Sequence, residues 1–139
     1  MKPERLTNVL LVDDDAVDVM NLQRAFSRNN IRNPLFVAST GQEALDLLRS
    51  GDFPKSRVVV LLDINLPRMS GLEFLRLLRA DEELCSTMVV VLTTSNDERD
   101  RIAAYKLNVA GFLLKPETSA NFVELAATIN KYWSMLEMP

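Results

Sequence analysis

Five short apolar runs constrain the fold of this chain more than any other feature of its sequence. They are rich in β-branched residues and occupy residues 8–12, 35–39, 57–62, 88–92 and 111–114. Because they are apolar throughout, without alternating polar residues, they predict strands that are buried on both faces, as in a parallel sheet. A stretch with helical spacing follows each run, at residues 17–28, 42–50, 72–79, 98–107 and 121 to about 136. The sequence therefore predicts an α/β fold of five βα units, (βα)5, in which helices cover both faces of a doubly wound parallel sheet.

Capping signals support two of these helices. Thr40 with Glu43, and Ser95 with Glu98, fit the S/T-x-x-E capping box, in which side chain and backbone satisfy free N–H groups at a helix start. Asn108 follows the fourth helical stretch, and asparagine can end a helix in the left-handed conformation. We therefore expect well-defined ends for the second and fourth helices.

The size and charge of the chain limit its partners. Its 139 residues predict a single domain over residues 1–139, with no output domain after a slightly extended C-terminal helix. With 16 Lys and Arg against 19 Asp and Glu, the net charge of −3 argues against a nucleic-acid partner. No apolar run approaches the roughly 20 residues of a membrane span, so no membrane partner is expected. The single cysteine, Cys85, and the lack of a secretion signal predict a cytoplasmic protein.

The residues that can carry chemistry follow the predicted strands. Histidine is absent, which excludes Ser-His-Asp and Cys-His nucleophilic sites. In open parallel sheets, functional sites lie beyond the carboxyl ends of the strands. The positions after the first, third, fourth and fifth runs hold acids, hydroxyls and a lysine: Asp13, Asp14, Asp15, Asp63, Thr93, Thr94 and Lys115. We expect these side chains to converge on one rim of the sheet.

The acids of this rim predict a magnesium site. Asp15 and Asp18 are interpreted as an N-cap and a favourable charge at the start of the first helix. The other carboxylates would repel one another near Asp63 unless a cation lay among them, and an all-oxygen ligand set favours Mg²⁺. Beside a bound cation, the Asp63 carboxylate could act as a nucleophile toward phosphorus, with Lys115 neutralising charge.

Four motifs resemble those of a known family. They are Val9-Leu10-Leu11-Val12-Asp13-Asp14, Leu62-Asp63-Ile64-Asn65-Leu66-Pro67, Leu92-Thr93 and Lys115-Pro116. Their order and spacing resemble the receiver domains of two-component response regulators over nearly the whole chain. The resemblance implies a flavodoxin-like sheet with strand order 2-1-3-4-5. It also implies a signalling protein and not an enzyme, which catalyses only its own phosphorylation and dephosphorylation.

The resemblance assigns a role to each site residue. Asp63 would be the phosphoacceptor, taking a phosphoryl group from a phosphohistidine of a sensor histidine kinase. Thr93 and Lys115 would bind the phosphoryl oxygens. Mg²⁺ would bind the side chains of Asp14 and Asp63 and the backbone carbonyl of Asn65, and Asp13 would complete the site through a water molecule.

Two further expectations come from the same resemblance. Thr93 and Phe112 match the hydroxyl and aromatic positions of the family's switch, although Phe112 fits a plain core residue equally well. The family pattern also implies a cis bond between Lys115 and Pro116, whereas the general preference of X-Pro bonds favours trans.

A narrower resemblance concerns the second half of the chain. Thr93-Thr94-Ser95, the segment 104–109, Tyr132-Trp133 and Met138-Pro139 are similar to small stand-alone regulators that partner bacterial phytochromes. This similarity predicts that the partner kinase is a bacteriophytochrome.

The end of the fifth helix predicts self-association. It carries several apolar residues, and a helix can bury only one stripe against its own sheet. We expect a homodimer through the fourth helix, fifth strand and fifth helix, with Trp133 near its centre. A monomer with Trp133 packed inward is the alternative.

Other functions fit parts of the sequence. The segment from Asp13 to Val17 fits the D-x-D-x-[TV] motif of haloacid-dehalogenase-like phosphatases, with Asp13 as nucleophile. Those enzymes need a further acidic pair after the lysine, whereas only scattered glutamates follow Lys115, and the chain has no room for a substrate-selecting cap. A chemotaxis-type receiver and a pseudo-receiver that serves as an adaptor are further alternatives.

Overall fold

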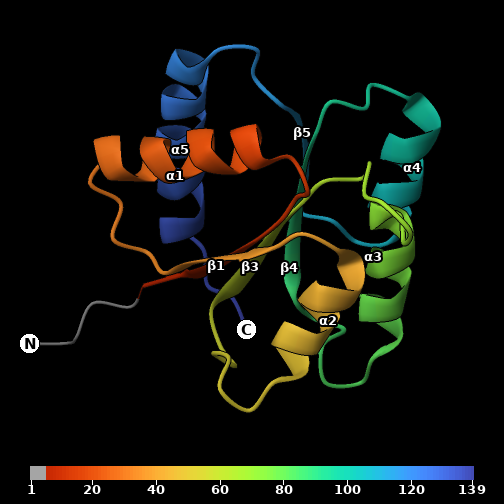
Figure 1. Ribbon diagram of the computed structural model, residues 1–139. Coiled ribbons are helices and arrows are strands. Elements are labelled where there is room, and N and C mark those ends of the chain that lie inside the picture. The colour runs from red at the N-terminus through yellow and green to blue at the C-terminus, as the bar shows by residue number, and fades with distance from the viewer. Residues whose placement is uncertain (1–5) are drawn as a thin grey trace, which may run out of the picture.

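Five strands and five helices alternate along residues 6–139, the residues that the computed structural model describes (Figure 1). The strands are β1 (Asn8–Val12), β2 (Leu35–Ala38), β3 (Val58–Leu62), β4 (Met88–Thr93) and β5 (Gly111–Leu114). The helices are α1 (Ala16–Arg28), α2 (Gly41–Arg49), α3 (Gly71–Ala80), α4 (Glu98–Lys106) and α5 (Ser119–Ser134). Every predicted element is present, with ends that lie within two residues of the prediction. The first five residues of the predicted domain lie outside the described residues.

The strands form one parallel sheet in the order β2-β1-β3-β4-β5, which confirms the expected topology. Helices α1 and α5 cover one face, and α2, α3 and α4 cover the other (Figure 1). The side chains of β1 alternate between the two cores: Val9 and Leu11 pack with α1 and α5, while Leu10 and Val12 pack with α2 and α3. The strands are apolar throughout because both of their faces are buried. No helix in the described part of the chain is long and apolar enough to cross a membrane.

The start of α2 follows the predicted capping box with one change. Thr40 Oγ1 accepts the backbone N–H of Glu43 at 3.0 Å, as expected for the N-cap. The carboxylate of Glu43 accepts the N–H and the hydroxyl of Ser39, at 3.2 and 2.9 Å. The reciprocal bond of the box therefore reaches one residue further back along the chain than predicted.

The capping box predicted at Ser95 is wrong, because α4 begins with a different cap. Asp97 is the N-cap, and its Oδ1 accepts the N–H of Arg99 at 2.8 Å. Ser95 donates its hydroxyl to Asp100 Oδ2 at 2.7 Å. Aspartate caps helices as well as serine does, and Asp97 directly precedes the first helical residue. Asn108 follows α4 with a φ of 62°, the left-handed conformation that the sequence predicted there.

Helix α5 corrects the prediction for Trp133. The helix buries a stripe at i, i+4 and i+3 spacing: Phe122, Ala126, Ile129 and Trp133. Trp133 is only 1% exposed and packs edge-to-face on Phe26 of α1, with 6.3 Å between ring centroids. Its indole N–H donates to Asn130 Oδ1 at 2.9 Å. Trp133 is therefore a core residue of the α1–α5 layer and not the centre of an interface, while Tyr132 and Met135 are exposed.

Candidate functional site

The carboxyl ends of four strands bring the predicted site residues to one rim. Asp13 follows β1, Asp63 follows β3, Thr93 ends β4 and Lys115 follows β5. Because these four strands are parallel neighbours in the sheet, their carboxyl ends lie side by side. Asp13, Asp63 and Thr93 are also buried, at 3%, 5% and 0% exposure, although all three are polar. Buried polar groups need partners, and these residues find them in one another and in Lys115.

The β3–α3 loop fixes the position of Asp63. The N–H of Asn65 donates to Asp63 Oδ1 at 3.0 Å, and the N–H of Gly71 donates to the carbonyl of Ile64 at 2.9 Å. A Cβ at Gly71 would lie 2.6 Å from Ile64 Cα and closer still to the Asp63 carbonyl oxygen. Helix α3 can therefore begin this close to the end of β3 only because residue 71 is glycine.

Lys115 binds three carboxylates at once. Its Nζ lies 2.8 Å from Oδ2 of each of Asp13, Asp18 and Asp63. The lysine side chain is 4% exposed, so these carboxylates take the place of most of its water. An ammonium group has three protons, and each carboxylate can accept one of them.

Burial and hydrogen bonding together set the protonation of this cluster. Burial by itself lowers the pKa of Lys115, but the hydrogen bonds to Asp13, Asp18 and Asp63 outweigh it and raise the pKa above its usual value. Burial raises the pKa of Asp13, and the hydrogen bond from Lys115 opposes that rise without cancelling it. Lys115 is therefore a fixed positive charge at neutral pH.

Thr93 faces the site and Thr94 does not. The Thr93 hydroxyl donates to Asp63 Oδ1 at 2.7 Å and accepts the backbone N–H of Ser95 at 3.2 Å. Thr94, the next residue, is exposed. The structure thus brings the predicted hydroxyl into contact with the predicted phosphoacceptor.

Three acids of the rim could hold a metal ion. One carboxylate oxygen from each of Asp13, Asp14 and Asp63 lies within 4.8 Å of the others. Asp14 is exposed while Asp13 and Asp63 are buried, so the group opens to solvent on one side. A set of oxygen ligands with an open side fits a hard divalent cation that keeps some of its water, as Mg²⁺ does.

Two predictions concern residues beside the site. Phe112 is partly buried and packs against the core that includes α2 and α3, so its role in a switch stays a prediction. The bond between Lys115 and Pro116 is trans, and the predicted cis bond is wrong. Trans is the general preference of X-Pro bonds, and with it Lys115 still reaches all three carboxylates.

The contact between Asp18 and Lys115 was missed by sequence analysis. Asp15 is the N-cap of α1, as predicted, and its Oδ1 accepts the N–H groups of Val17 and Asp18 at 2.9 and 3.2 Å. Asp18 was assigned only a favourable interaction with the helix dipole. Its sole signal in the sequence is its place in the first turn of the helix that begins at the rim.

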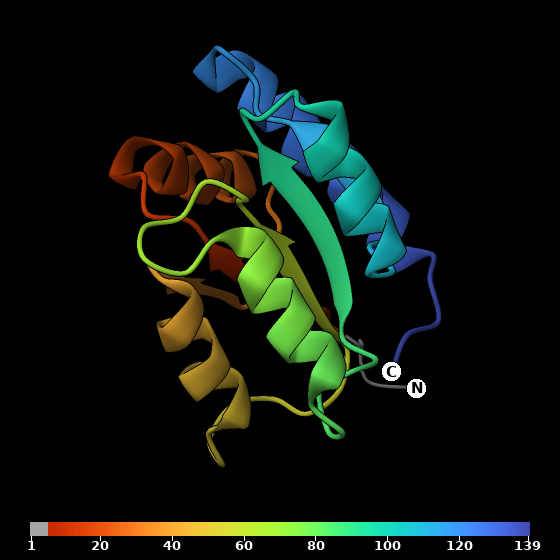
Figure 2. The same ribbon diagram turned by 90° about the vertical axis from the view of Figure 1, so that its right-hand side faces the viewer.

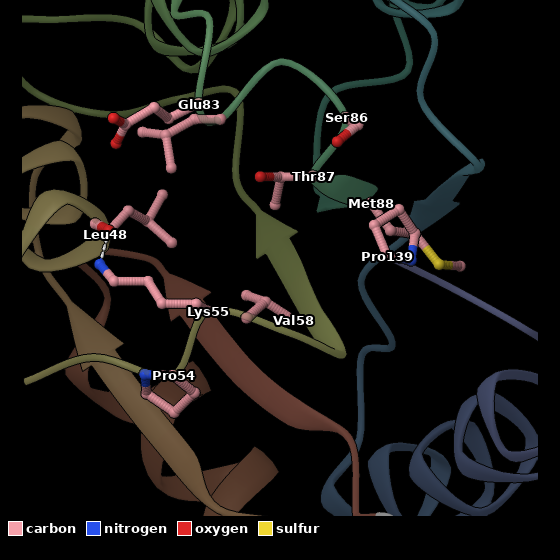
Figure 3. Close-up of a pocket in the computed structure, with 10 residues that line it drawn as sticks. Leu48, Pro54, Lys55, Val58, Glu83, Ser86, Thr87, Met88 and Pro139 are labelled. Atoms are coloured by element: carbon pink, nitrogen blue, oxygen red, sulfur yellow. Dashed lines mark hydrogen bonds between the residues drawn. The ribbon is translucent and has the colours of Figure 1, made fainter.

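A cavity of about 270 Å³ lies at the amino ends of β3 and β4, at the other end of the strands from the site (Figure 3). It is lined in part by Val58 and Met88, the first residues of β3 and β4. Lys55 also lines it, and its ammonium donates to the carbonyls of Leu48 and Ser50 at 3.2 and 2.6 Å. The cavity is therefore separated from Asp63 and Thr93 by the length of the strands and adds nothing to the site.

Comparison with known proteins identifies the family. Residues 9–127 match the response regulator receiver domain. The chain is 32% identical to the response regulator Rcp1 of Synechocystis sp. over 128 residues, which are 90% of this chain and 87% of Rcp1. It is 35% identical to a probable methanogenesis regulatory protein, FilR2, of Methanothrix harundinacea over 127 residues, 90% of this chain and 82% of FilR2. The chain belongs to the response regulator receiver family.

The solved structures that are similar to this receiver domain include response regulators of phytochromes. It superposes on the phosphorylated cyanobacterial phytochrome response regulator RcpA with a TM-score of 0.86 and 27% identity, covering 97% of this chain and 99% of RcpA. The Mn²⁺-bound form of Rcp1 gives a TM-score of 0.82 and 30% identity, covering 96% and 99%. Response regulators of bacteriophytochromes are also among the similar structures. The receiver domain thus resembles the phytochrome-associated regulators, as the sequence predicted.

Proposed function

We propose that this receiver domain accepts a phosphoryl group on Asp63 from a phosphohistidine of a sensor histidine kinase. The environment of the Asp63 carboxylate carries the proposal. Oδ1 accepts the Thr93 hydroxyl at 2.7 Å and the Asn65 N–H at 3.0 Å, and Oδ2 accepts the Lys115 ammonium at 2.8 Å. A carboxylate held on both oxygens, at the open rim of the sheet and beside other acids, is a positioned nucleophile.

The transfer would exchange one bond to phosphorus for another. An oxygen of the Asp63 carboxylate attacks phosphorus, and the new P–O bond forms as the P–N bond of the phosphohistidine breaks. The electron pair of the P–N bond stays on the imidazole of the kinase, which takes up a proton. This chain has no histidine, and it needs none, because phosphoryl transfer depends mainly on positioning and charge neutralisation. Lys115 supplies that positive charge.

The acids beside Asp63 are the side chains that would hold Mg²⁺. Asp13, Asp14 and Asp63 supply the carboxylate oxygens, and the backbone carbonyl of Asn65 is the further ligand that we propose. An Mg²⁺ ion bound there would neutralise negative charge between the carboxylates and the phosphoryl oxygens. The Mn²⁺ in the similar structure of Rcp1 supports a divalent cation at this rim.

The phosphorylated state would change the bonds of Thr93. Its hydroxyl would turn from Asp63 Oδ1 to a phosphoryl oxygen and release the N–H of Ser95, which it holds at 3.2 Å. The Ser95 hydroxyl contacts Asp100 of α4 at 2.7 Å, so this change would reach the start of α4. Phe112, partly buried on β5, is the aromatic partner of the switch. Phosphorylation would thereby bias an existing equilibrium between two arrangements.

The partner that we propose is a phytochrome histidine kinase of the cytoplasm. RcpA, which covers nearly this whole chain, is described as a phytochrome response regulator, and bacteriophytochrome regulators are similar as well. Phosphotransfer from each histidine kinase of the source organism in turn tests the pairing. The phytochrome kinase should transfer fastest, and faster transfer from another kinase would refute the pairing.

Phosphate incorporation tests the acceptor. The wild type should acquire acid-labile, hydroxylamine-sensitive phosphate with Mg²⁺ present, and Asp63→Asn should acquire none. Asp46→Asn is the matched control, because Asp46 is exposed on α2 and accepts a side-chain bond from Gln42 on the same helix. Retained incorporation in Asp63→Asn would contradict the proposal, and a label on Asp13 would indicate the phosphatase mechanism.

We also propose a homodimer through α4, β5 and α5, with a centre other than Trp133. Ile102 and Tyr105 on α4 and Leu114 on β5 are apolar and 47%, 50% and 50% exposed. Sedimentation with and without a phosphoryl analogue tests this surface. Ile102→Lys should weaken association, and Leu77→Lys, at an exposed apolar residue on α3, should not. A wild type that stays monomeric at high concentration in both states would eliminate the dimer.

A further inference from the structure

The ammonium group of Lys115 is shared among three carboxylates. Its three carboxylate partners come from three parts of the chain: Asp13 after β1, Asp18 in α1 and Asp63 after β3, each at 2.8 Å. The ammonium donates hydrogen bonds to Asp18 and Asp63, and Asp13 is an ion-pair partner at the same distance. A phosphoryl group on Asp63 would take over the bond that Lys115 now donates to the Asp63 carboxylate, and it would share the ammonium with Asp13 and Asp18.

The three carboxylates differ in how firmly they are held. The Asp13 side chain is 2% exposed, and its Oδ1 also accepts the N–H of Asp15 at 2.9 Å. The Asp63 side chain is 6% exposed and is held by further donors on its Oδ1. The Asp18 side chain is 20% exposed, the most of the three. Of the two carboxylates that would remain beside the phosphoryl group, Asp13 and Asp18, water can replace the lysine more easily at Asp18, so Asp18 is the contact that can yield.

We propose that Asp18 is a positioning residue that holds Lys115 before phosphorylation and competes with the phosphoryl group for it afterwards. This inference rests on the proposed function of Asp63. Asp18 fixes the ammonium at the rim from the α1 side, so that Lys115 is already in place when the phosphoryl group arrives. Because Asp18 also attracts the Lys115 ammonium, the phosphoryl oxygens bind that ammonium less strongly. The phosphorylated state is therefore less stable than it would be without Asp18.

Binding of beryllofluoride, an analogue of the phosphoryl group, tests the competition. Asp18→Asn keeps the size of the side chain but replaces the carboxylate by a neutral amide, a weaker acceptor for an ammonium group. At saturating Mg²⁺, Asp18→Asn should bind beryllofluoride about threefold to tenfold more tightly than the wild type, as measured by calorimetry. A purely structural role for Asp18 predicts the opposite sign, because damage to the rim would weaken binding.

Asp15→Asn is the matched control. It removes the same charge from the same end of α1, and asparagine caps helices as well as aspartate. Asp15 is the N-cap and bonds backbone N–H groups of α1, so this variant should bind beryllofluoride within about twofold of the wild type. Equal tightening in both variants would overturn the proposal, because the cause would then be general charge and not competition for Lys115. Unchanged or weaker binding by Asp18→Asn would overturn it as well.

A measurement on the wild type does not depend on how the variants fold. Addition of beryllofluoride and Mg²⁺ should shift the ¹³C resonance of the Asp18 carboxylate as it loses Lys115, and should shift that of Asp15 much less. An unmoved Asp18 resonance in protein that binds beryllofluoride would overturn the role of Asp18 alone. Failure of the wild type to bind beryllofluoride would instead overturn the assignment of Asp63 as phosphoacceptor.

Discussion

Two cationic side chains at opposite ends of the sheet are bound in different ways. At the amino ends of β4 and β5, the guanidinium of Arg79 donates to four backbone carbonyls, at distances from 2.6 to 3.1 Å: those of Cys85, Thr87, Leu107 and Asn108. At the carboxyl ends, the ammonium of Lys115 donates to three carboxylates. Arg79 lies at the end of α3, so its bonds tie that helix to the segments that precede both strands. Figure 2 shows the end of α3 close to the start of β4.

The two arrangements respond differently to a change of charge. Backbone carbonyls neither ionise nor accept a phosphoryl group, so the charge of the groups that Arg79 binds does not change with pH or phosphorylation. The carboxylates around Lys115 can bind a cation, and the proposed function adds a phosphoryl group to one of them. A cation bound by backbone carbonyls therefore stabilises one structure, whereas a cation shared among carboxylates can respond to a signal.

The largest effect is expected from removing Lys115. In the absence of divalent cations, Lys115→Met should lower the free energy of unfolding by about 3 kcal/mol, because the acids of the rim lose their buried positive charge. Mg²⁺ should restore most of this loss, since a cation among Asp13, Asp14 and Asp63 supplies positive charge at the same place. Urea unfolding with a chelator measures the loss of stability, and urea unfolding with saturating Mg²⁺ measures its recovery.

Lys106→Met is the control for that experiment, because Lys106 is exposed in the last turn of α4. It should change stability little, and Mg²⁺ should stabilise it as it stabilises the wild type. If Mg²⁺ stabilised Lys115→Met no more than the wild type, the cation would not act at the carboxylates around Lys115, and the contrast with Arg79 would be lost.

A smaller effect, independent of Mg²⁺, is expected at the other end of the sheet. Arg79→Met leaves four carbonyls without their donor, some of which water can reach, and should lower the free energy of unfolding by about 2 kcal/mol. Affinity for beryllofluoride should not change. Arg76→Met, at an exposed arginine of the same helix, is the control and should be nearly neutral. Recovery of Arg79→Met by Mg²⁺ would contradict the distinction between the two ends.

The sequence was sufficient to predict the sheet and the rim. Runs such as 58–62 are apolar on both sides of the strand, and only a sheet covered on both faces buries both sides. Once the strands are parallel, the polar residue after each one lies at the same edge. Asp63, Thr93 and Lys115 were therefore predicted to meet, and the structure brings them into contact.

What the sequence could not show depends on contacts between distant elements. Asp18 meets Lys115 across 97 positions of the chain, and helical spacing indicates nothing about that partner. Trp133 belongs to an apolar stripe of α5, and its burial depends on its contact with Phe26 of α1, a distant element. Ser95 and Asp97 both fit a cap, and the geometry of the β4–α4 loop decides between them.

The smallest predicted effect concerns Asp81, which follows α3 near Arg79. The backbone N–H of Glu83 donates to Asp81 Oδ1 at 2.9 Å, the N–H of Leu84 donates to the same oxygen at 3.2 Å, and Arg49 contacts Oδ2 at 3.2 Å. The bond from Glu83, with those from Arg49 and Leu84, holds the pKa of Asp81 below its usual value. A carboxylate with a lowered pKa adds stability above the ordinary aspartate pKa of about 3.9, and loses it as the pH falls through the lowered value.

Asp81→Asn should therefore be slightly less stable than the wild type at neutral pH, and the difference should shrink as the pH falls below about 3.9. Asparagine keeps an oxygen acceptor for the N–H of Glu83, so the variant removes mainly the charge. Urea unfolding of both proteins at neutral pH and at several values below pH 4 measures the difference, with Asp52→Asn at an exposed turn after α2 as control. A difference that grows on acidification would contradict the assigned direction. It would mean that folding raises the pKa of Asp81, as burial raises the pKa of Asp13 at the other end of the sheet.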